Sequence, residues 1–142
     1  MSTVDPERLE KLFSSMRTAV ALLSELRDLP AATFLSDPHM QSSAKYNFTA
    51  AIEAAIDIAS HIISRKGLRA PNDYADTFEV LREAEIVPPD FAVDLKKMAR
   101  FRNRLVHRYW DVDTAELRRI LQTRLAEFER YIACIGSYLA KG

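Results

Sequence analysis

The sequence predicts an all-α protein, an up-and-down helical bundle of four long helices plus one short helix. Three observations predict it. Apolar residues recur at three- and four-residue spacing through most of the chain, only three of the 142 residues are glycine, and the six prolines stand at the edges of the apolar segments. No segment of useful length shows the two-residue alternation of a strand. The length suits one domain over residues 1–142 with a single core.

Start and stop signals mark the expected helices. Asp5-Pro6 and Asp37-Pro38 each place a capping side chain before a proline at the first helical position. Asp113 and Glu116 have the spacing of a capping box, and Gly67 suits a left-handed helix end. Residues 29–36 are expected to form a connector. The expected helices cover about residues 6–28, 38–66, 73–85, 89–108 and 114–141.

The composition is that of a globular protein outside the membrane. Hydrophobic residues make up 48% and charged residues 28%, with a net charge of zero. No apolar run is long enough to cross a bilayer, and the first residues lack the pattern of a signal peptide. The single cysteine, Cys134, excludes an intrachain disulfide and is expected to be a small core residue. We therefore expect a cytoplasmic protein.

The stretch from Lys96 to Trp110 is the candidate functional segment. It holds six basic residues between Lys96 and Arg108 and no acidic one. On a helical wheel, Arg102 falls near the centre of an apolar stripe, where a guanidinium is costly unless it is paired or lines a polar seam. The stripe comprises Phe91, Leu95, Met98, Leu105 and Val106, and the opposite face carries Lys97, Arg100, Arg104 and Arg108 together with His107.

Glu53, Asp57 and His61 recur every four residues on one flank of the second long helix. Three such side chains could hold a metal, but this spacing also arises on any solvated helix face. No other ligand cluster accompanies them, so we expect no metal and no cofactor. Glu53 and Asp57 are instead the candidate partners of Arg102, in a structural ion pair or at an interface.

Arg102, His107 and Tyr109 carry a resemblance to a known family. Their Arg-x4-His-x-Tyr pattern, with the polar Asn103 after the arginine, resembles the signature of the HepT-like branch of the HEPN superfamily. The similarity extends to the segments 55–63 and 71–74 and covers roughly residues 5–140. It implies the same helical bundle, usually paired as a homodimer with both motifs facing one cleft.

The resemblance also implies a function. HEPN ribonucleases use the arginine and histidine of the motif, here Arg102 and His107, to cleave RNA without a metal. In the HepT-like branch the tyrosine, here Tyr109, receives AMP from a cognate MNT-type nucleotidyltransferase antitoxin that silences the toxin. The alternative is a non-catalytic HEPN partner that binds nucleotide or positions substrate for a separate nucleotidyltransferase. A helical dimer without any RNA role is the third interpretation.

The chemistry fits these residue types, but their spacing raises a difficulty. Histidine transfers protons near neutral pH, and arginine holds phosphate oxygens with a permanent charge. Five residues of straight helix, however, separate two side chains by about 140°. The helix could loosen near Leu105, Arg102 could curl round, or a second subunit could complete the site. We expect the composite site.

The basic face and the terminal aromatic residue each leave two interpretations open. Such a face could contact the RNA backbone or be an ordinary solvated face, and the absence of acids favours RNA. The expected backbone contacts are Lys97, Arg100, Arg104 and Arg108. Trp110 could stack on a base, although we expect it to anchor the edge of the bundle.

Overall fold

The computed structural model describes residues 3–141. Gly142 lies outside it, as do Met1 and Ser2, which belong to the N-terminal segment considered above for a signal peptide. Residues 3–141 form helices without any strand, which confirms the all-α class. The elements are α1 (Pro6–Arg27), α2 (Ala31–Leu35), α3 (Pro38–Arg65), α4 (Tyr74–Glu83), α5 (Pro89–His107), the 3-10 turn η1 (Tyr109–Asp111), α6 (Thr114–Thr123) and α7 (Ala126–Lys141).

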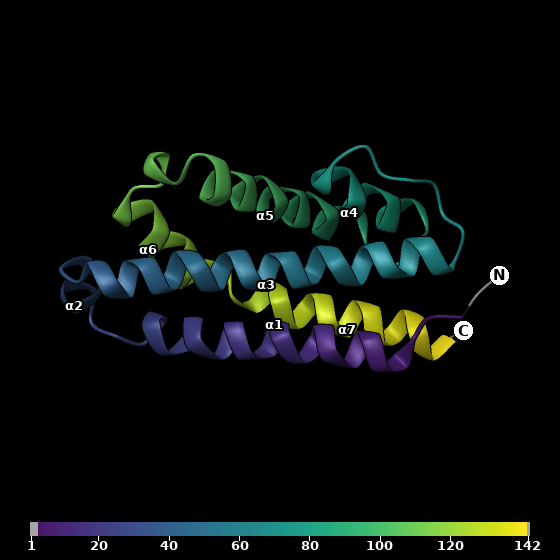
Figure 1. Ribbon diagram of the computed structural model, residues 1–142, viewed down its shortest axis with the longest axis horizontal. Helices are drawn as coiled ribbons and strands as arrows, with labels where there is room; N and C mark the ends of the chain where they lie inside the picture. The colour runs from purple at the N-terminus through teal and green to yellow at the C-terminus, as the bar shows by residue number, and fades with distance from the viewer. Residues whose placement is uncertain (1–2, 142) are drawn as a thin grey trace.

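Helix α3 runs through the middle of the molecule (Figure 1). Helix α1 lies along one side of it and α5 along the other, with α4 beside the first half of α5. Helix α7 packs on α1 and α3, and the two ends of the described chain lie at the same end of the bundle (Figure 1). The site-bearing helix α5 is thus an outer helix with one face on the core.

The central position of α3 follows from its composition. Alanines recur along its buried surface, and small side chains let neighbouring helices approach closely. Phe48 of α3 meets Phe101 of α5 edge to face, with ring centres 5.6 Å apart. The buried Tyr131 of α7 donates a hydrogen bond from its hydroxyl to the carbonyl of Ala55, at 2.8 Å. These contacts fix α5 and α7 against α3.

The predicted helix ends at Asp5, Asp37 and Gly67 are confirmed. Both aspartates accept backbone N–H bonds at the start of their helices, and Gly67 has a φ of 65°. The capping box is only half formed. Asp113 accepts the N–H of Glu116 at 2.7 Å, whereas the Glu116 carboxylate binds Arg104 rather than reaching back to Asp113.

Two boundary predictions were wrong. The expected connector 29–36 contains α2, whose Phe34 is fully buried. The expected single helix over 114–141 is two helices, α6 and α7, separated at Arg124 and Leu125. The buried Leu125 belongs to the apolar pattern of both helices, so the periodicity continues across the break. Because no proline or glycine stands there, the sequence carries no stop signal.

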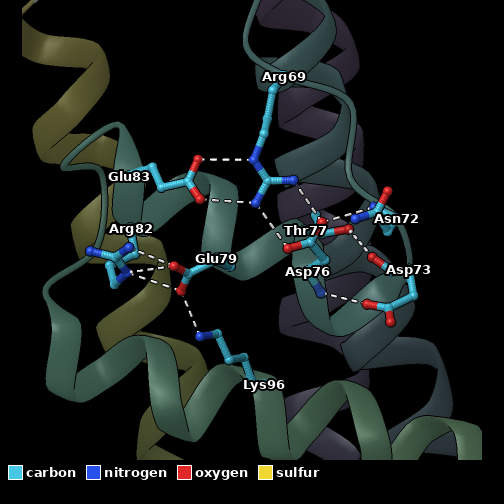
Figure 2. A network of polar contacts seen from close by, with 9 residues as sticks. All are labelled: Arg69, Asn72, Asp73, Asp76, Thr77, Glu79, Arg82, Glu83 and Lys96. Carbon is cyan, nitrogen blue, oxygen red and sulfur yellow. Dashed lines mark hydrogen bonds and ion pairs between the residues drawn. The ribbon is translucent and has the colours of Figure 1, made fainter.

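A network of charged side chains fixes α4 and the loop before it (Figure 2). Arg69 donates to both carboxylate oxygens of Asp76, at 2.7 and 2.9 Å, and of Glu83, at 2.9 Å each. Glu79 accepts from Arg82 and, at 2.6 Å, from Lys96 of α5. Lys96 thus ties α5 to α4, and it is not available to the basic face.

No helix within residues 3–141 is both long enough and apolar enough to span a bilayer.

Candidate functional site on helix α5

Helix α5 keeps its α-helical form through its last residue, His107. The loosening near Leu105 that would bring Arg102 and His107 together does not occur, and Leu105 is buried. The two side chains therefore leave the helix about 140° apart. Within one chain they lie on different faces of α5.

Arg102 is held against α3 and α4. Its side chain is only 11% exposed, and its Nη2 lies 2.6 Å from the Glu53 carboxylate. Its Nε donates to the same oxygen at 3.3 Å, and its Nη1 donates to the Asn103 side chain at 3.3 Å. The guanidinium carbon lies 4.9 Å from the ring centre of Tyr74. This arrangement fixes the arginine in place, so it does not curl toward His107.

Of the two expected carboxylate partners, Glu53 makes the ion pair, and Asp57 makes none within residues 3–141. Burial raises the pKa of Asp57, an effect that the nearby Arg8 opposes. Glu53 and Asp57 line a hollow of about 180 Å³ together with Ile56 and Tyr74. Two of its lining residues, Glu53 and Tyr74, also contact the Arg102 guanidinium.

His61 is occupied by a structural contact. Its Nε2 accepts a hydrogen bond from the backbone N–H of Asp5 at 2.9 Å. Burial and the neighbouring Arg65 lower the pKa of His61. Glu53, Asp57 and His61 do not form a metal-binding group, and no other three such side chains do so within residues 3–141.

His107 ends α5 as an exposed side chain, and it makes no hydrogen bond or ion pair to another side chain in the described part of the protein. The 3-10 turn η1 follows directly and presents Tyr109 and Trp110, which are 60% and 67% exposed. Their rings meet edge to face at 5.5 Å. The expectation that Trp110 anchors the bundle was wrong, and Val106, expected in the core, is 42% exposed. The helix ends here, so no later turn covers these side chains.

The structure divides the predicted basic face into two parts. Lys97 and Arg100 are exposed and have no ion pair within the described residues. Arg104 binds both oxygens of Glu116, at 2.6 and 2.8 Å, and Arg108 pairs with Asp111. The bound carboxylate raises the pKa of Arg104. These acids come from α6 and η1, so a local count of charges in α5 could not reveal them.

Sequence reasoning also missed Tyr74 as a site residue. It begins α4, is 44% exposed, and covers the guanidinium of Arg102. Its place in the quoted segment 71–74 was the available signal, but the contact depends on how α4 folds back on α5.

Comparison with known proteins finds relatives that are named HepT nucleases. It is 32% identical over 102 residues to the mRNA nuclease HepT of Shewanella oneidensis, covering 72% of this chain and 77% of that protein. It is 26% identical to the tRNA nuclease HepT of Aphanizomenon flos-aquae, over 98% and 95% of the two chains. A solved structure of the tri-AMPylated Shewanella oneidensis HEPN toxin in complex with MNT antitoxin superimposes with a TM-score of 0.84 and 26% identity, covering 91% of this chain and 96% of that one. The family model described as ribonuclease HepT-like matches residues 16–135. The protein belongs to the ribonuclease HepT-like family.

Proposed function

We propose that this protein is the toxin of a type VII HEPN–MNT toxin–antitoxin pair, a metal-independent endoribonuclease that acts as a homodimer. The observation that carries the proposal is the state of the two motif residues. Arg102 is fixed by Glu53 and Tyr74, and two of its N–H groups have no partner within residues 3–141. His107 stands exposed on the same helix.

Arg102 has the remaining donors that a phosphate needs. A guanidinium carries five N–H donors, and the contacts to Glu53 and Asn103 use three of them. One N–H on Nη1 and one on Nη2 are left for the non-bridging oxygens of a phosphodiester. Bound there, the arginine would stabilise the charge that grows on the phosphate oxygens in the transition state.

His107 would carry the proton transfer. In metal-free RNA cleavage, a base takes the proton of the 2′-hydroxyl, the 2′-oxygen attacks phosphorus, and an acid protonates the departing 5′-oxygen. Imidazole can perform either transfer near neutral pH. Because the attacking oxygen is the 2′-hydroxyl, the substrate class is RNA.

A second copy of the chain would bring the two groups together. Because α5 stays helical and Glu53 holds Arg102, the His107 of the same chain cannot face this arginine. A neighbouring subunit is the remaining source of a facing histidine. Two exposed apolar side chains flank Arg102 and suit a two-fold contact: Tyr74, 44% exposed, and Val106, 42% exposed and one turn along the same helix face. Each cleft would then combine Arg102 of one subunit with His107 of the other.

Tyr109 would be the switch. Its ring is 60% exposed, and it lies two residues after His107. An AMP group on its hydroxyl would place a phosphodiester charge beside the imidazole, repelling RNA and filling the cleft. A structurally similar HEPN toxin is AMPylated in its complex with an MNT antitoxin, which supports the same partner here.

Lys97 and Arg100 would supply the main backbone affinity for RNA, with Arg104 and Arg108 contributing less because acids hold them. Such contacts weaken steeply as salt concentration rises.

The direct experiment is cleavage of total RNA by pure protein in EDTA, with Arg102→Ala and His107→Ala variants. We expect cleavage by the wild type and loss of at least roughly a hundredfold in each variant. Arg17→Ala, an exposed substitution on α1, should cleave like the wild type. Equal residual cleavage by all four folded proteins would show a contaminating nuclease, and an inactive wild type would favour the non-catalytic partner.

A further inference from the structure

A pocket of about 230 Å³ opens on the face of α5 that is turned away from Arg102. Residues of α3, α5, α6 and α7 line it, together with Arg124 from the break between α6 and α7. The floor is aromatic and apolar, and the rim is basic. The floor residues are Phe48, Ile52, Met98, Phe101, Ile120 and Phe128, and the cations of the rim are Lys97, Arg100, Arg104, Arg119 and Arg124.

The rim carries positive charge that the protein does not neutralise. Arg104 is paired with Glu116, and Arg124 with Asp94 and Glu127. The side chains of Lys97, Arg100 and Arg119 have no ion pair within residues 3–141. They come from two helices, α5 and α6, and converge on one opening. The pocket thus offers an apolar ring site beside an anion site.

We infer that this pocket binds one unstacked nucleotide of the RNA, with its base against the apolar lining and its phosphate at the Lys97–Arg100–Arg119 rim. The size agrees with this ligand. Pockets that enclose a whole drug-sized molecule hold about 300–1,000 Å³, so the smaller volume here suits the base alone and leaves sugar and phosphate at the rim. The buried rings of Phe48, Phe101 and Phe128 offer apolar surface rather than an open face for stacking. A cationic groove that holds the backbone beside a surface that takes the base is usual for single-stranded nucleic acid.

Two rim residues of the pocket, Arg100 and Arg104, lie on the same side of α5 as His107. Residues 100, 104 and 107 fall within about 60° of one another on the helix, whereas 102 lies about 160° from 104. Arg104 separates the pocket from His107 by a single turn. This inference rests on the proposed function, because it makes the pocket a base subsite beside the phosphate that His107 serves.

Binding of a non-cleavable probe tests it. The probe is a fluorescent single-stranded 2′-O-methyl RNA, made with each of the four bases, in an intact form and a form with abasic sites. Ile120→Trp, which fills the pocket, should weaken the intact probe roughly tenfold and leave the abasic probe unchanged.

The rim variant separates charge from base recognition. Arg119→Gln should weaken both probes and reduce the salt dependence of binding, whereas Arg17→Gln on α1, a helix that does not line the pocket, should change neither. Intact and abasic probes that bind the wild type alike would overturn the inference. So would a mononucleotide that binds more tightly than the RNA, because the pocket would then serve a free nucleotide.

The two proposals fail separately. If the wild type does not cleave RNA but binds the intact probe more tightly than the abasic one, the nuclease proposal fails and the pocket inference stands. If Ile120→Trp cleaves every RNA as fast as the wild type, the pocket inference fails and the nuclease proposal stands. Circular dichroism checks that both pocket variants fold. If Ile120→Trp does not fold, probe binding by Arg119→Gln tests the inference instead.

Discussion

Arg102 occupies its place because Glu53 compensates its charge. A guanidinium only 11% exposed needs an anion, and a hydrogen-bonded carboxylate from α3 supplies it. The ion pair therefore does two things: it stabilises the packing of α5 on α3, and it aims the unused N–H donors. A change in Glu53 should affect both stability and activity.

Glu53→Gln should lower the free energy of unfolding by about 1 kcal/mol, since the carboxylate is 45% exposed and solvent screens part of the interaction. RNA cleavage should fall with it, because Arg102 loses its fixed orientation. Urea unfolding and the cleavage assay measure the two effects.

Asp57→Asn is the matched control, one turn along the same helix. A raised pKa in the folded state means that folding disfavours the charged form, so the charge costs stability as pH rises through that pKa. Asp57→Asn should thus be neutral or stabilising at pH 7. A larger loss than in Glu53→Gln would contradict the assigned ion pair.

Tyr109→Phe tests the modification. It removes only the hydroxyl of an exposed ring, so the protein should fold and cleave RNA normally. Co-incubation with the antitoxin and ATP should add AMP to the wild type, detected by mass spectrometry, and abolish its cleavage. If the antitoxin silences Tyr109→Phe as completely, AMP transfer to this residue is not the mechanism.

At this scale the sequence foretold where Arg102 points but not what holds it. The helical wheel places the guanidinium on the apolar side. It does not distinguish Glu53 from Asp57 as the partner, because the two lie one turn apart on the same flank of α3. The choice between them depends on how α5 is set along α3. Trp110 was misjudged because its exposure follows from the helix end at His107.

Among the elements, α4 depends most on charge. Its ten residues are tied by Arg69 to the preceding loop and by Lys96 to α5 (Figure 2). The bound cations lower the pKa of Asp76 and Glu83, and that of Glu79 to about 2. A lowered folded-state pKa contributes stability above the unfolded value, and that contribution is lost as pH falls through the folded one.

The free energy of unfolding should therefore fall between about pH 4.5 and about pH 2, the window that Glu79 defines. Arg69→Gln should make this acid decline shallower, because Asp76 and Glu83 lose their partner. Urea unfolding across this range measures it. Lys11→Gln breaks only an exposed ion pair with Glu7, so it should leave the dependence of the free energy of unfolding on pH unchanged. An equal change in both variants would show that the Arg69 network does not cause the acid decline.

The helices were predictable where local chemistry determines their ends. Asp-Pro starts and Gly67 mark boundaries that any tertiary structure would respect. The break between α6 and α7 was not predictable, because Leu125 continues the apolar phase across it and no proline or glycine marks it. Likewise, Glu116 binds Arg104 across a helix boundary instead of completing its own cap.

For the whole molecule, the bundle follows from periodicity and composition, and the family relation adds the shared architecture. The site is a different matter. Neither the sequence nor one folded chain brings Arg102 and His107 together, because a straight helix separates them and Glu53 holds the arginine. The proposed cleft is a property of two chains.

Mixing two inactive variants tests this most directly. Arg102→Ala and His107→Ala subunits, unfolded together and refolded, form mixed dimers in which one cleft has lost both groups and the other keeps both. If dimers assemble at random, half are mixed and half of their sites are intact, so RNA cleavage should recover to about a quarter of the wild-type rate. A mixture that stays as inactive as its components, with mixed dimers shown by native mass spectrometry, would contradict the composite site.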